Sequence, residues 1–331
     1  MNNSIKVENI SKKFRLIKRE NGKRETLKNL FHREYIEKEA VKKINFYVND
    51  GEIVGYIGLN GAGKSTTIKM LSGILIPSSG NIEVAGINPF KDRIEHTKNI
   101  ATVFGQRSQL WWDLPVSESL SLAKYMYCVS DNQYKDKINY FNKYMELNEI
   151  INIPVRQLSL GQRMKADICF ALVHDPKILF LDEPTIGLDI IIKKQVQDYI
   201  KELNKQKGVT VILTTHDIGD IEKLCNRVIV IDKGILIYDD SLDNLKKNFC
   251  NNNSISFILN EDNIDENLLR NLNINHFNYN NHKLDICMDS INNHTAEIIK
   301  LIIDNYNVKD LMISNNNLED IITNLYNLKN K

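Results

Sequence analysis

This chain of 331 residues has few of the features that mark disulfide-stapled, metal-bound or membrane-spanning proteins. Its five cysteines are widely spaced, form no CxxC pair and accompany no His pattern of metal-ligand spacing, which argues against a disulfide framework and a zinc site. No stretch approaches the roughly 20 apolar residues that a bilayer span needs. We therefore expect a soluble protein with reduced cysteines, whose role at a membrane requires another chain.

An excess of charge of one sign is also missing. The formal net charge is +1, with 43 Lys and Arg residues against 42 Asp and Glu residues. Because this balance gives no overall attraction to nucleic acid, we expect no specific nucleic-acid partner. The length allows one large core and a smaller one, so two domains are expected.

Tryptophan is equally scarce, and the two that are present stand side by side. Trp111 and Trp112 lie in FGQRSQLWWDLP, residues 104–115, among polar residues and just before a turn-forming Asp-Leu-Pro. A Trp ring is most useful where it fills a pocket on a partner, which favours a contact surface. The alternative is a loop that folds back onto the core of its own chain.

The strongest motif is GEIVGYIGLNGAGKSTTIKML, residues 51–71. Its first part reads as a buried strand and its last part as a helix, with a glycine-rich loop between them. Such a loop turns backbone N–H groups toward a phosphate chain at the start of a helix. Lys64 is expected to reach the phosphates, Ser65 to bind Mg²⁺ and Thr66 to help hold the phosphates. The other loop residues assigned to the nucleotide are Gly58, Asn60, Gly61, Ala62 and Gly63.

A second strand pattern carries two acidic residues at its end. In KILFLDEPTIGLD, residues 177–189, the apolar run delivers Asp182 and Glu183 to the carboxyl end of a strand, where open α/β sheets bind ligands. Asp182 is predicted to hold Mg²⁺ through water. Glu183 is predicted to accept or polarise a proton from the attacking water.

The stretch VTVILTTHD, residues 209–217, repeats this order of apolar strand and polar end. Thr214, Thr215 and His216 are therefore expected at the same edge of the sheet as Glu183. A lone His is usually structural or solvated. One at a strand end beside a nucleotide site is placed to contact the γ-phosphate or to position water, and we predict that role for His216.

Residues 156–189, RQLSLGQRMKADICFALVHDPKILFLDEPTIGLD, resemble the region between the signature and Walker B motifs of ABC-type ATPases. The likeness spans roughly residues 1–240 and implies a P-loop NTPase of ABC type, with a mixed sheet core, a β-subdomain and a helical subdomain at about 107–165. It also implies that Ser159, Gly161 and Gln162 contact ATP bound by a second copy of the chain. Leu160 departs from the family, which commonly has Gly there.

The resemblance assigns further roles. Gln106 takes the family's Q-loop position, where the side chain senses Mg²⁺ and the attacking water. Phe14, in ENISKKF, is the candidate for stacking on adenine. Asp189 is expected beside the nucleotide, in communication between two sites. The Trp pair would then border a groove that receives a transmembrane permease partner, contacted through Gln106–Pro115.

Residues 14–40 form an insertion that is longer than the usual connection in this family, and its first part is strongly basic. In ETLKNLFHREYIEK, residues 25–38, apolar residues fall on one helical face and predict a short amphipathic helix: Leu27, Leu30, Phe31 and Tyr35. Two functions stay open for the insertion, a solvated cover over the nucleotide site and a contact with a membrane partner or anionic lipid headgroups.

After about residue 240 the sequence becomes rich in Asn and has none of the catalytic motifs. Strand patterns alternate with helical ones, which predicts a small α+β domain over residues 241–331. The closing stretch NNNLEDIITNLYNL predicts an amphipathic helix with Leu318, Ile321, Ile322 and Leu325 on one face. Disorder of the Asn clusters is the alternative. The tail resembles the accessory domain of ABC-2-type exporters, which implies dimer stabilisation or regulation.

Together these features predict the ATP-hydrolysing subunit of a membrane transporter, held peripherally at the cytoplasmic face. ATP and Mg²⁺ are the expected cofactors, and a second copy or a paralogous ATPase is the expected partner. The alternative is an ABC-type ATPase that acts on ribosomes, DNA or a soluble scaffold, although the double cassette of the first class and the long coiled coils of the second are missing from the sequence.

Overall fold

The computed structural model describes residues 3–17, 35–105, 107–249, 253–261, 264, 269, 277–288, 295–314 and 318–328. The chain divides into two compact units, Met1–Asp240 and Ser241–Lys331. That the two units are independently folding domains remains a prediction. Each is described by itself.

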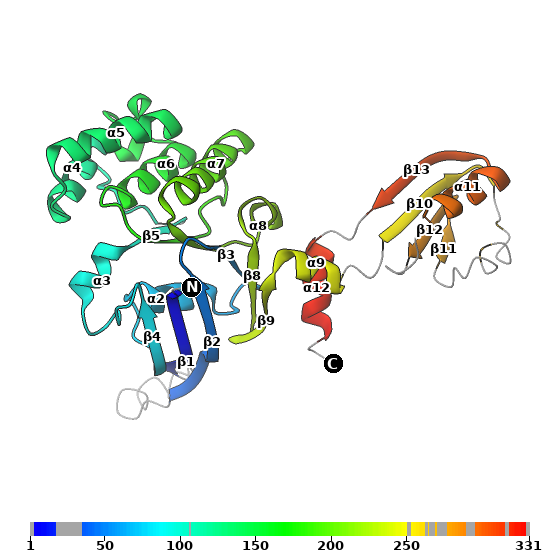
Figure 1. Ribbon diagram of the computed structural model, residues 1–331, viewed down its shortest axis with the longest axis horizontal. Helices are drawn as coiled ribbons and strands as arrows, with labels where there is room; N and C mark the ends of the chain where they lie inside the picture. The colour runs from blue at the N-terminus through cyan, green and yellow to red at the C-terminus, as the bar shows by residue number, and fades with distance from the viewer. Residues whose placement is uncertain are drawn as a thin grey trace, which may run out of the picture. The chain divides into compact units, whose positions relative to one another are not determined.

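A six-stranded sheet in the order β5-β6-β7-β3-β8-β9 forms the centre of the larger unit (Figure 1). Its strands are β3 (Ile53–Ile57), β5 (Ile100–Phe104), β6 (Ile178–Asp182), β7 (Thr210–Thr214), β8 (Arg227–Asp232) and β9 (Ile235–Ser241). The five strands from β5 to β8 in this order pair in parallel. Strands β3 and β7 are buried at every position, as apolar runs covered on both faces require. Their carboxyl ends therefore meet at one edge.

A second, antiparallel sheet has the order β2-β1-β4. It consists of β1 (Asn3–Ile17), β2 (Tyr35–Asn49) and β4 (Ser79–Val84). The inner half of β2 alternates buried and more exposed residues, which marks a sheet with one face on the core. Helix α2 (Lys64–Leu71) lies between the two sheets, and one apolar cluster joins all three elements (Figure 1).

Most helices of the larger unit gather on the side of the central sheet away from the antiparallel sheet, whereas α3 lies nearer to α2 and β4 (Figure 1). The helices are α3 (Arg93–Asn99), α4 (Val116–Met126), α5 (Asp131–Met145), α6 (Leu160–Ala171), α7 (Ile190–Lys207) and α8 (Ile218–Leu224), with short 3₁₀ turns at Leu147–Glu149 and Val155–Gln157. Ser130 and Ser159 begin α5 and α6 with capping boxes. None of the helices that the structure describes is both long enough and apolar enough to cross a bilayer.

The prediction of a helix over residues 25–38 is wrong for residues 35–38, the part of that range that the structure describes. Residues 18–34 lie outside the described part of the chain, while Tyr35 begins strand β2 and pairs with Ile17. Ile36 pairs with Leu16 in the same ladder. Backbone pairing with β1 decides the structure here, whereas the sequence pattern reported only the local spacing of apolar residues.

The smaller unit holds a four-stranded sheet in the order β11-β12-β10-β13, with antiparallel pairs throughout. Its described elements are α9 (Leu242–Phe249), β10 (Asn253–Leu259), β11 (Phe277–Asn280), β12 (Lys283–Met288), α11 (Thr295–Asn305), β13 (Val308–Ser314) and α12 (Leu318–Leu328). Alternate residues of β10 and β12 form a core with α11. The apolar face predicted for α12 is buried. One of the helical patterns of this domain, DENLLRNL at residues 265–272, lies almost wholly outside the described residues.

Candidate functional site

Nine of the predicted site residues line one cavity of about 610 Å³ at the carboxyl edge of the central sheet. They come from β1, the loop before α2, the first turn of α2, and the segments that follow β6 and β7. The nine are Phe14, Asn60, Gly61, Gly63, Lys64, Ser65, Thr66, Glu183 and His216, and Lys38, Ala40 and Ile186 complete the wall. Segments far apart in sequence thus converge as the motif analysis expected.

The loop between β3 and α2 needs glycine where it turns into the helix. Gly63 has φ of 113°, and a Cβ atom there would lie 2.6 Å from the carbonyl oxygen of Ala40. Lys64, the first residue of α2, is only 6% exposed, and its Nζ donates to the Gly58 carbonyl at 2.6 Å. Burial lowers the pKa of Lys64, while the charges of Glu183 and Asp182 act to raise it. A cation is therefore held inside the loop.

Three oxygen-bearing side chains, from Ser65, Thr214 and Asp182, meet near this lysine. Ser65 Oγ donates to Asp182 Oδ1 at 3.2 Å, and Thr214 Oγ1 donates to the same oxygen at 2.5 Å. Within the described ranges no group of three or more His, Cys, Asp or Glu side chains is able to hold a metal. A hydroxyl and one carboxylate fit Mg²⁺, which takes few protein ligands and completes its shell with water and phosphate oxygens.

Glu183 is held in an unusual backbone conformation, with φ of 55°. Its N–H donates to the carbonyl of Thr214 at 2.9 Å, while the N–H of Gly105 donates to the carbonyl of Asp182 at 2.8 Å. A Cβ atom on Gly105 would lie 2.0 Å from the Glu183 carbonyl oxygen, so only glycine fits. His216 Nδ1 lies 3.4 Å from Glu183 Oε1, which brings the two predicted catalytic side chains together.

Sequence reasoning missed Gly105 and a buried carboxylate behind the site. Asp220, in α8, is 0% exposed. It accepts hydrogen bonds from Thr185 Oγ1 at 2.5 Å, Gln197 Nε2 at 2.6 Å and Thr215 Oγ1 at 3.2 Å. Thr185 follows the Glu183 turn and Thr215 precedes His216, so one carboxylate ties both catalytic segments together. The sequence offered only one local indication of the role of Gly105, which is that a glycine directly follows an apolar strand pattern.

The four predicted residues of the signature and of the GLD segment do not line this cavity. Ser159 caps α6, with its Oγ accepting from the Gln162 N–H at 3.2 Å. Gly161 is buried in the first turn of α6. Asp189 caps α7 by accepting from the N–H groups of residues 191 and 192, each at 3.0 Å. The structure thus leaves these residues away from the phosphate loop of their own chain.

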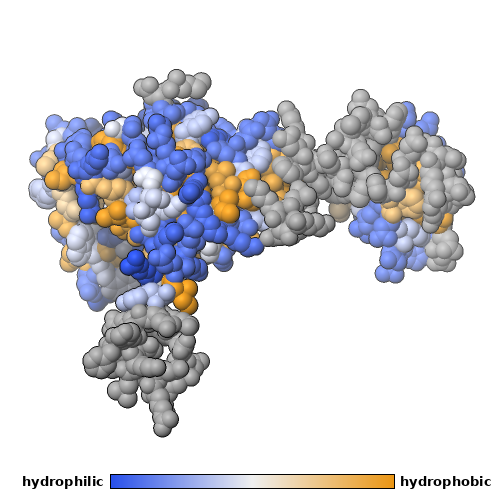
Figure 2. Space-filling model, turned by 90° about the horizontal axis from the view of Figure 1, so that it is seen from below, coloured by the Kyte–Doolittle hydropathy of each residue, from blue (hydrophilic) through white to orange (hydrophobic). Residues whose placement is uncertain are grey.

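The tryptophans are exposed, which contradicts the interpretation that they fold onto the core. Trp111 is 43% and Trp112 53% exposed, with Leu114 beside them at 43%. Tyr125 and Met126, at the carboxyl end of α4, are exposed as well. Apolar side chains reach the surface of the larger unit in several small groups amid polar ones (Figure 2). Gln106 lies outside the described residues.

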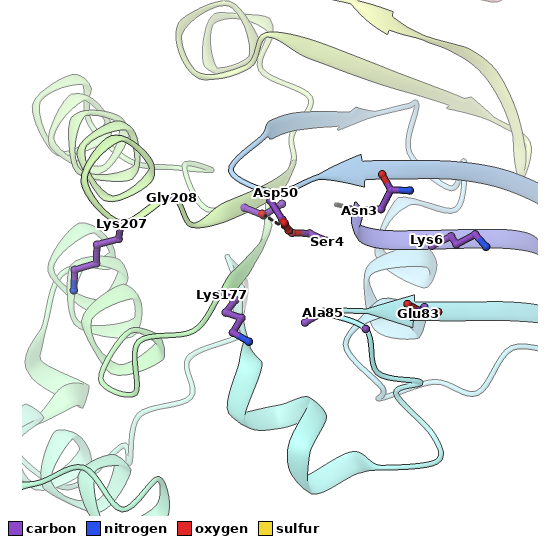
Figure 3. Close-up of a pocket in the computed structure, with 11 residues that line it drawn as sticks. Asn3, Ser4, Lys6, Asp50, Glu83, Ala85, Lys177, Lys207 and Gly208 are labelled. Carbon is purple, nitrogen blue, oxygen red and sulfur yellow. Dashed lines mark hydrogen bonds between the residues drawn. The ribbon is translucent and has the colours of Figure 1, made fainter. Parts of the chain in front are cut away.

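A larger cavity of about 770 Å³ lies near the amino-terminal ends of the parallel strands, beside Lys177 and Thr210 (Figure 3). It has no glycine-rich loop before a helix, and none of the predicted site residues lines it. At its wall Ser4 Oγ of β1 donates to Asp50 and lies 2.9 Å from Thr210 Oγ1 of β7. The second contact links the antiparallel sheet to the central sheet, which gives these polar residues a structural role, so size alone does not identify the nucleotide site.

A phosphate loop at a helix start, a Ser–Asp pair and a glutamate turned into the same cavity define a P-loop nucleotide hydrolase. Comparison with known proteins gives its family. The family model described as ABC transporter matches residues 41–186. The chain is 33% identical over 207 residues to the ABC transporter ATP-binding protein NatA of Bacillus subtilis, covering 62% of this chain and 84% of NatA. This chain belongs to the ABC transporter ATP-binding proteins: it binds ATP and is an ATPase of membrane transport.

Other relatives agree. The bacitracin transport ATP-binding protein BcrA of Bacillus licheniformis is 34% identical over 214 residues, covering 64% of this chain and 68% of BcrA. The linearmycin resistance ATP-binding protein LnrL of Bacillus subtilis is 36% identical over 203 residues, covering 61% and 65%. A dimeric post-hydrolysis structure of the cassette MJ0796, bound to ADP and Pi, has a TM-score of 0.59 and 26% identity, covering 72% of this chain and 98% of that one. The predicted ABC-type fold is confirmed.

Proposed function

We propose that this chain drives an ABC-2-type exporter by closing with a second copy, or a paralogue, around two ATP molecules. The observation that carries the catalytic part is the Glu183 turn. Its carboxylate reaches into the phosphate-loop cavity, 3.4 Å from His216 and next to the Ser65–Asp182 pair. Each of these groups has a distinct task in phosphoryl transfer.

The chain's own residues divide the chemistry. Lys64 neutralises phosphate charge, and Phe14, in the cavity wall, is placed to stack on the base. Ser65, Asp182 and Gln106 would hold Mg²⁺, and the ion would neutralise the charge that develops on the phosphate oxygens. Glu183 accepts a proton from the attacking water, and His216 positions that water and the γ-phosphate.

A second copy is required because the signature residues lie outside the cavity of their own chain. Ser159 and Gln162 begin α6 with N–H groups at an exposed helix start, which suits the γ-phosphate of an ATP held by another copy. Gly161 is buried and lets the first turn of α6 lie close to Ile192 of α7, the helix that Asp189 caps, so we assign both residues to the same ATP contact. A similar cassette forms a dimer bound to ADP and Pi, which supports this arrangement.

The exposed apolar loop supports a membrane partner. We infer that Trp111, Trp112 and Leu114 contact the polytopic permease subunits, together with the rest of residues 106–115. That contact makes the chain peripheral at the cytoplasmic face of the membrane. Relatives named for bacitracin transport and linearmycin resistance support an export function, as does the presence of the smaller unit.

The first test is Glu183→Gln in the full chain. The amide cannot accept the proton, so the turnover rate should fall by about 10²-fold or more while ATP still binds. Size-exclusion chromatography with light scattering should show a species of twice the 38.2 kDa chain mass that requires ATP and Mg²⁺. Undiminished hydrolysis would remove Glu183 from its role, and a monomer at saturating ATP would overturn the two-copy mechanism.

The matched control is Asp198→Asn, which removes an exposed acid from α7. This variant should hydrolyse ATP at the normal rate and should not accumulate an ATP-bound dimer. For the partner, affinity purification of the tagged chain from detergent-solubilised membranes should recover polytopic subunits. Recovery of ribosomes, DNA or a soluble scaffold instead would contradict the transport function.

A further inference from the structure

The helix that starts with the signature motif also holds the loop that carries both tryptophans. Asp167 lies on α6 four residues after Arg163, so the two side chains share one face of the helix. Asp167 Oδ1 accepts from Ser108 Oγ at 3.0 Å and from the Gln109 N–H at 2.8 Å. One turn nearer the signature, the Arg163 guanidinium lies 5.5 Å from the centre of the Trp112 ring.

The neighbouring contacts of this loop also run to the helical side of the unit. The N–H of Trp111 donates to Ser119 Oγ at 3.1 Å, at the start of α4. The Trp112 carbonyl accepts from the N–H of Arg156 at 2.9 Å, and the Arg156 side chain pairs with Asp113 at 3.0 Å. Arg156 lies three residues before the signature serine. The loop is therefore fastened to the segments on both sides of that serine.

Holding the loop with the Asp167 carboxylate costs free energy, because the carboxylate is buried. It is only 3% exposed, and a buried carboxylate loses hydration that its hydrogen bonds only partly replace. Burial raises its pKa to about 6, although the bonds from Gln109 and Ser108 and the charge of Arg163 act to lower it. A charged acceptor makes stronger and more directional hydrogen bonds than an amide oxygen does. Such strength matters where two elements must move as one.

We propose that Asp167 is a positioning residue that makes the tryptophan loop move with the signature helix, with Arg163 on Trp112 as the second contact. ATP captured by Ser159 in the closed pair would draw α6, and the loop would follow because Asp167 fixes its first residues. The inference rests on the proposed function, since it needs ATP-dependent closure. It assigns a role to a residue that contacts neither nucleotide nor partner.

The test uses the two tryptophans as probes, because the chain has no others. The Glu183→Gln chain is titrated with ATP and Mg²⁺ while Trp emission and dimer mass are recorded. We expect an emission change that accompanies dimer formation. Adding Asp167→Ala should reduce that change by about threefold or more, the scale of one lost coupling contact, while the dimer still forms. Asp167→Asn keeps an acceptor oxygen without the charge and should restore part of it.

Asp198→Ala, on the exposed face of α7, is the matched control and should leave the emission change intact. If Asp167→Ala lowers the amount of folded protein, Ser108→Ala removes one donor more gently and should give a partial loss. An unaltered emission change in Asp167→Ala and Ser108→Ala, or no emission change in a parent that does dimerise, overturns the coupling role. A parent that stays monomeric at saturating ATP overturns the proposed function instead.

Discussion

Asp167 should also make the stability of the larger unit depend on pH. Burial raises its pKa to about 6, above its usual value of 3.8, so the folded chain binds a proton more tightly than the unfolded chain does. Between about pH 4 and pH 6 the folded state therefore holds more protons. The stabilisation that this carboxyl group contributes is therefore fully present below its pKa in the unfolded chain. It is lost as the pH rises through its pKa in the folded chain.

Asp167→Asn removes this dependence. We expect the stability of the Asn variant relative to the parent to increase by roughly 1–2 kcal/mol between pH 5 and pH 7.5. Urea unfolding followed by Trp emission at both pH values measures the difference. Asp198→Asn, at an exposed position, serves as the reference. A parent-to-variant difference that stays constant over this range would contradict the buried, ionised carboxylate.

Single residues differ in how far the sequence reveals them. Lys64, Glu183 and His216 were predicted because each stands at a fixed place in a local pattern of strand, loop and helix. Gly105 and Asp167 were not, because their constraints come from residues about 60 to 80 positions away, such as the Glu183 carbonyl and the Ser108 hydroxyl. Steric and hydrogen-bonding partners of that kind leave no spacing to detect.

At the scale of elements, Asp220 joins four segments through one carboxylate. Besides its bonds to Thr185, Gln197 and Thr215, it lies 3.1 Å from Lys193 Nζ of α7. Asp220→Ala leaves the buried side chains of Thr185, Gln197 and Thr215 without their acceptor, while Lys193 keeps its pair with Asp217. We expect the free energy of unfolding to fall by about 3 kcal/mol or more, because each buried donor left unsatisfied costs roughly 1–3 kcal/mol.

The same variant should slow ATP hydrolysis, because the Thr185 and Thr215 bonds hold the Glu183 turn and the His216 loop in register. Chemical denaturation gives the stability, and turnover below the melting temperature separates catalysis from unfolding. Asp198→Ala, on the same helix α7 as Lys193 but exposed, is the control. Full turnover in a destabilised Asp220→Ala would show that Asp220 supports the fold without positioning the catalytic segments.

Elements buried on both faces were the predictable ones. The runs that became β3, β6 and β7 are short, apolar and followed by polar residues, and their burial in a parallel sheet matches that pattern. The prediction of secondary structure from the apolar pattern was wrong for residues 35–38. Apolar residues there also fit a helical face, and the deciding force is pairing with β1, where Lys13 and Arg15 both lie within 4 Å of Glu37. Such pairing depends on a distant strand.

At the scale of the whole molecule, the nucleotide cavity lies in the larger unit, while the smaller unit has a separate hydrophobic core. Every residue that lines the phosphate-loop cavity lies before residue 241, and both tryptophans do as well. The smaller unit has a core of its own, formed by β10, β12 and α11. If the units are independent domains, ATP should stabilise one of them and leave the other unchanged.

Calorimetry of the Glu183→Gln chain tests this separation. We expect two unfolding transitions, of which only the one that coincides with the change in Trp emission responds to ATP and Mg²⁺. At a ligand concentration of about 100 times Kd the larger unit gains about 2.7 kcal/mol, which for a domain of this size raises its Tm by roughly 5–10 °C. A chain ending at residue 240 should show the first transition alone, with the same response. A single transition that moves as a whole would mean that the two units unfold cooperatively, and the boundary after residue 240 would then not separate domains.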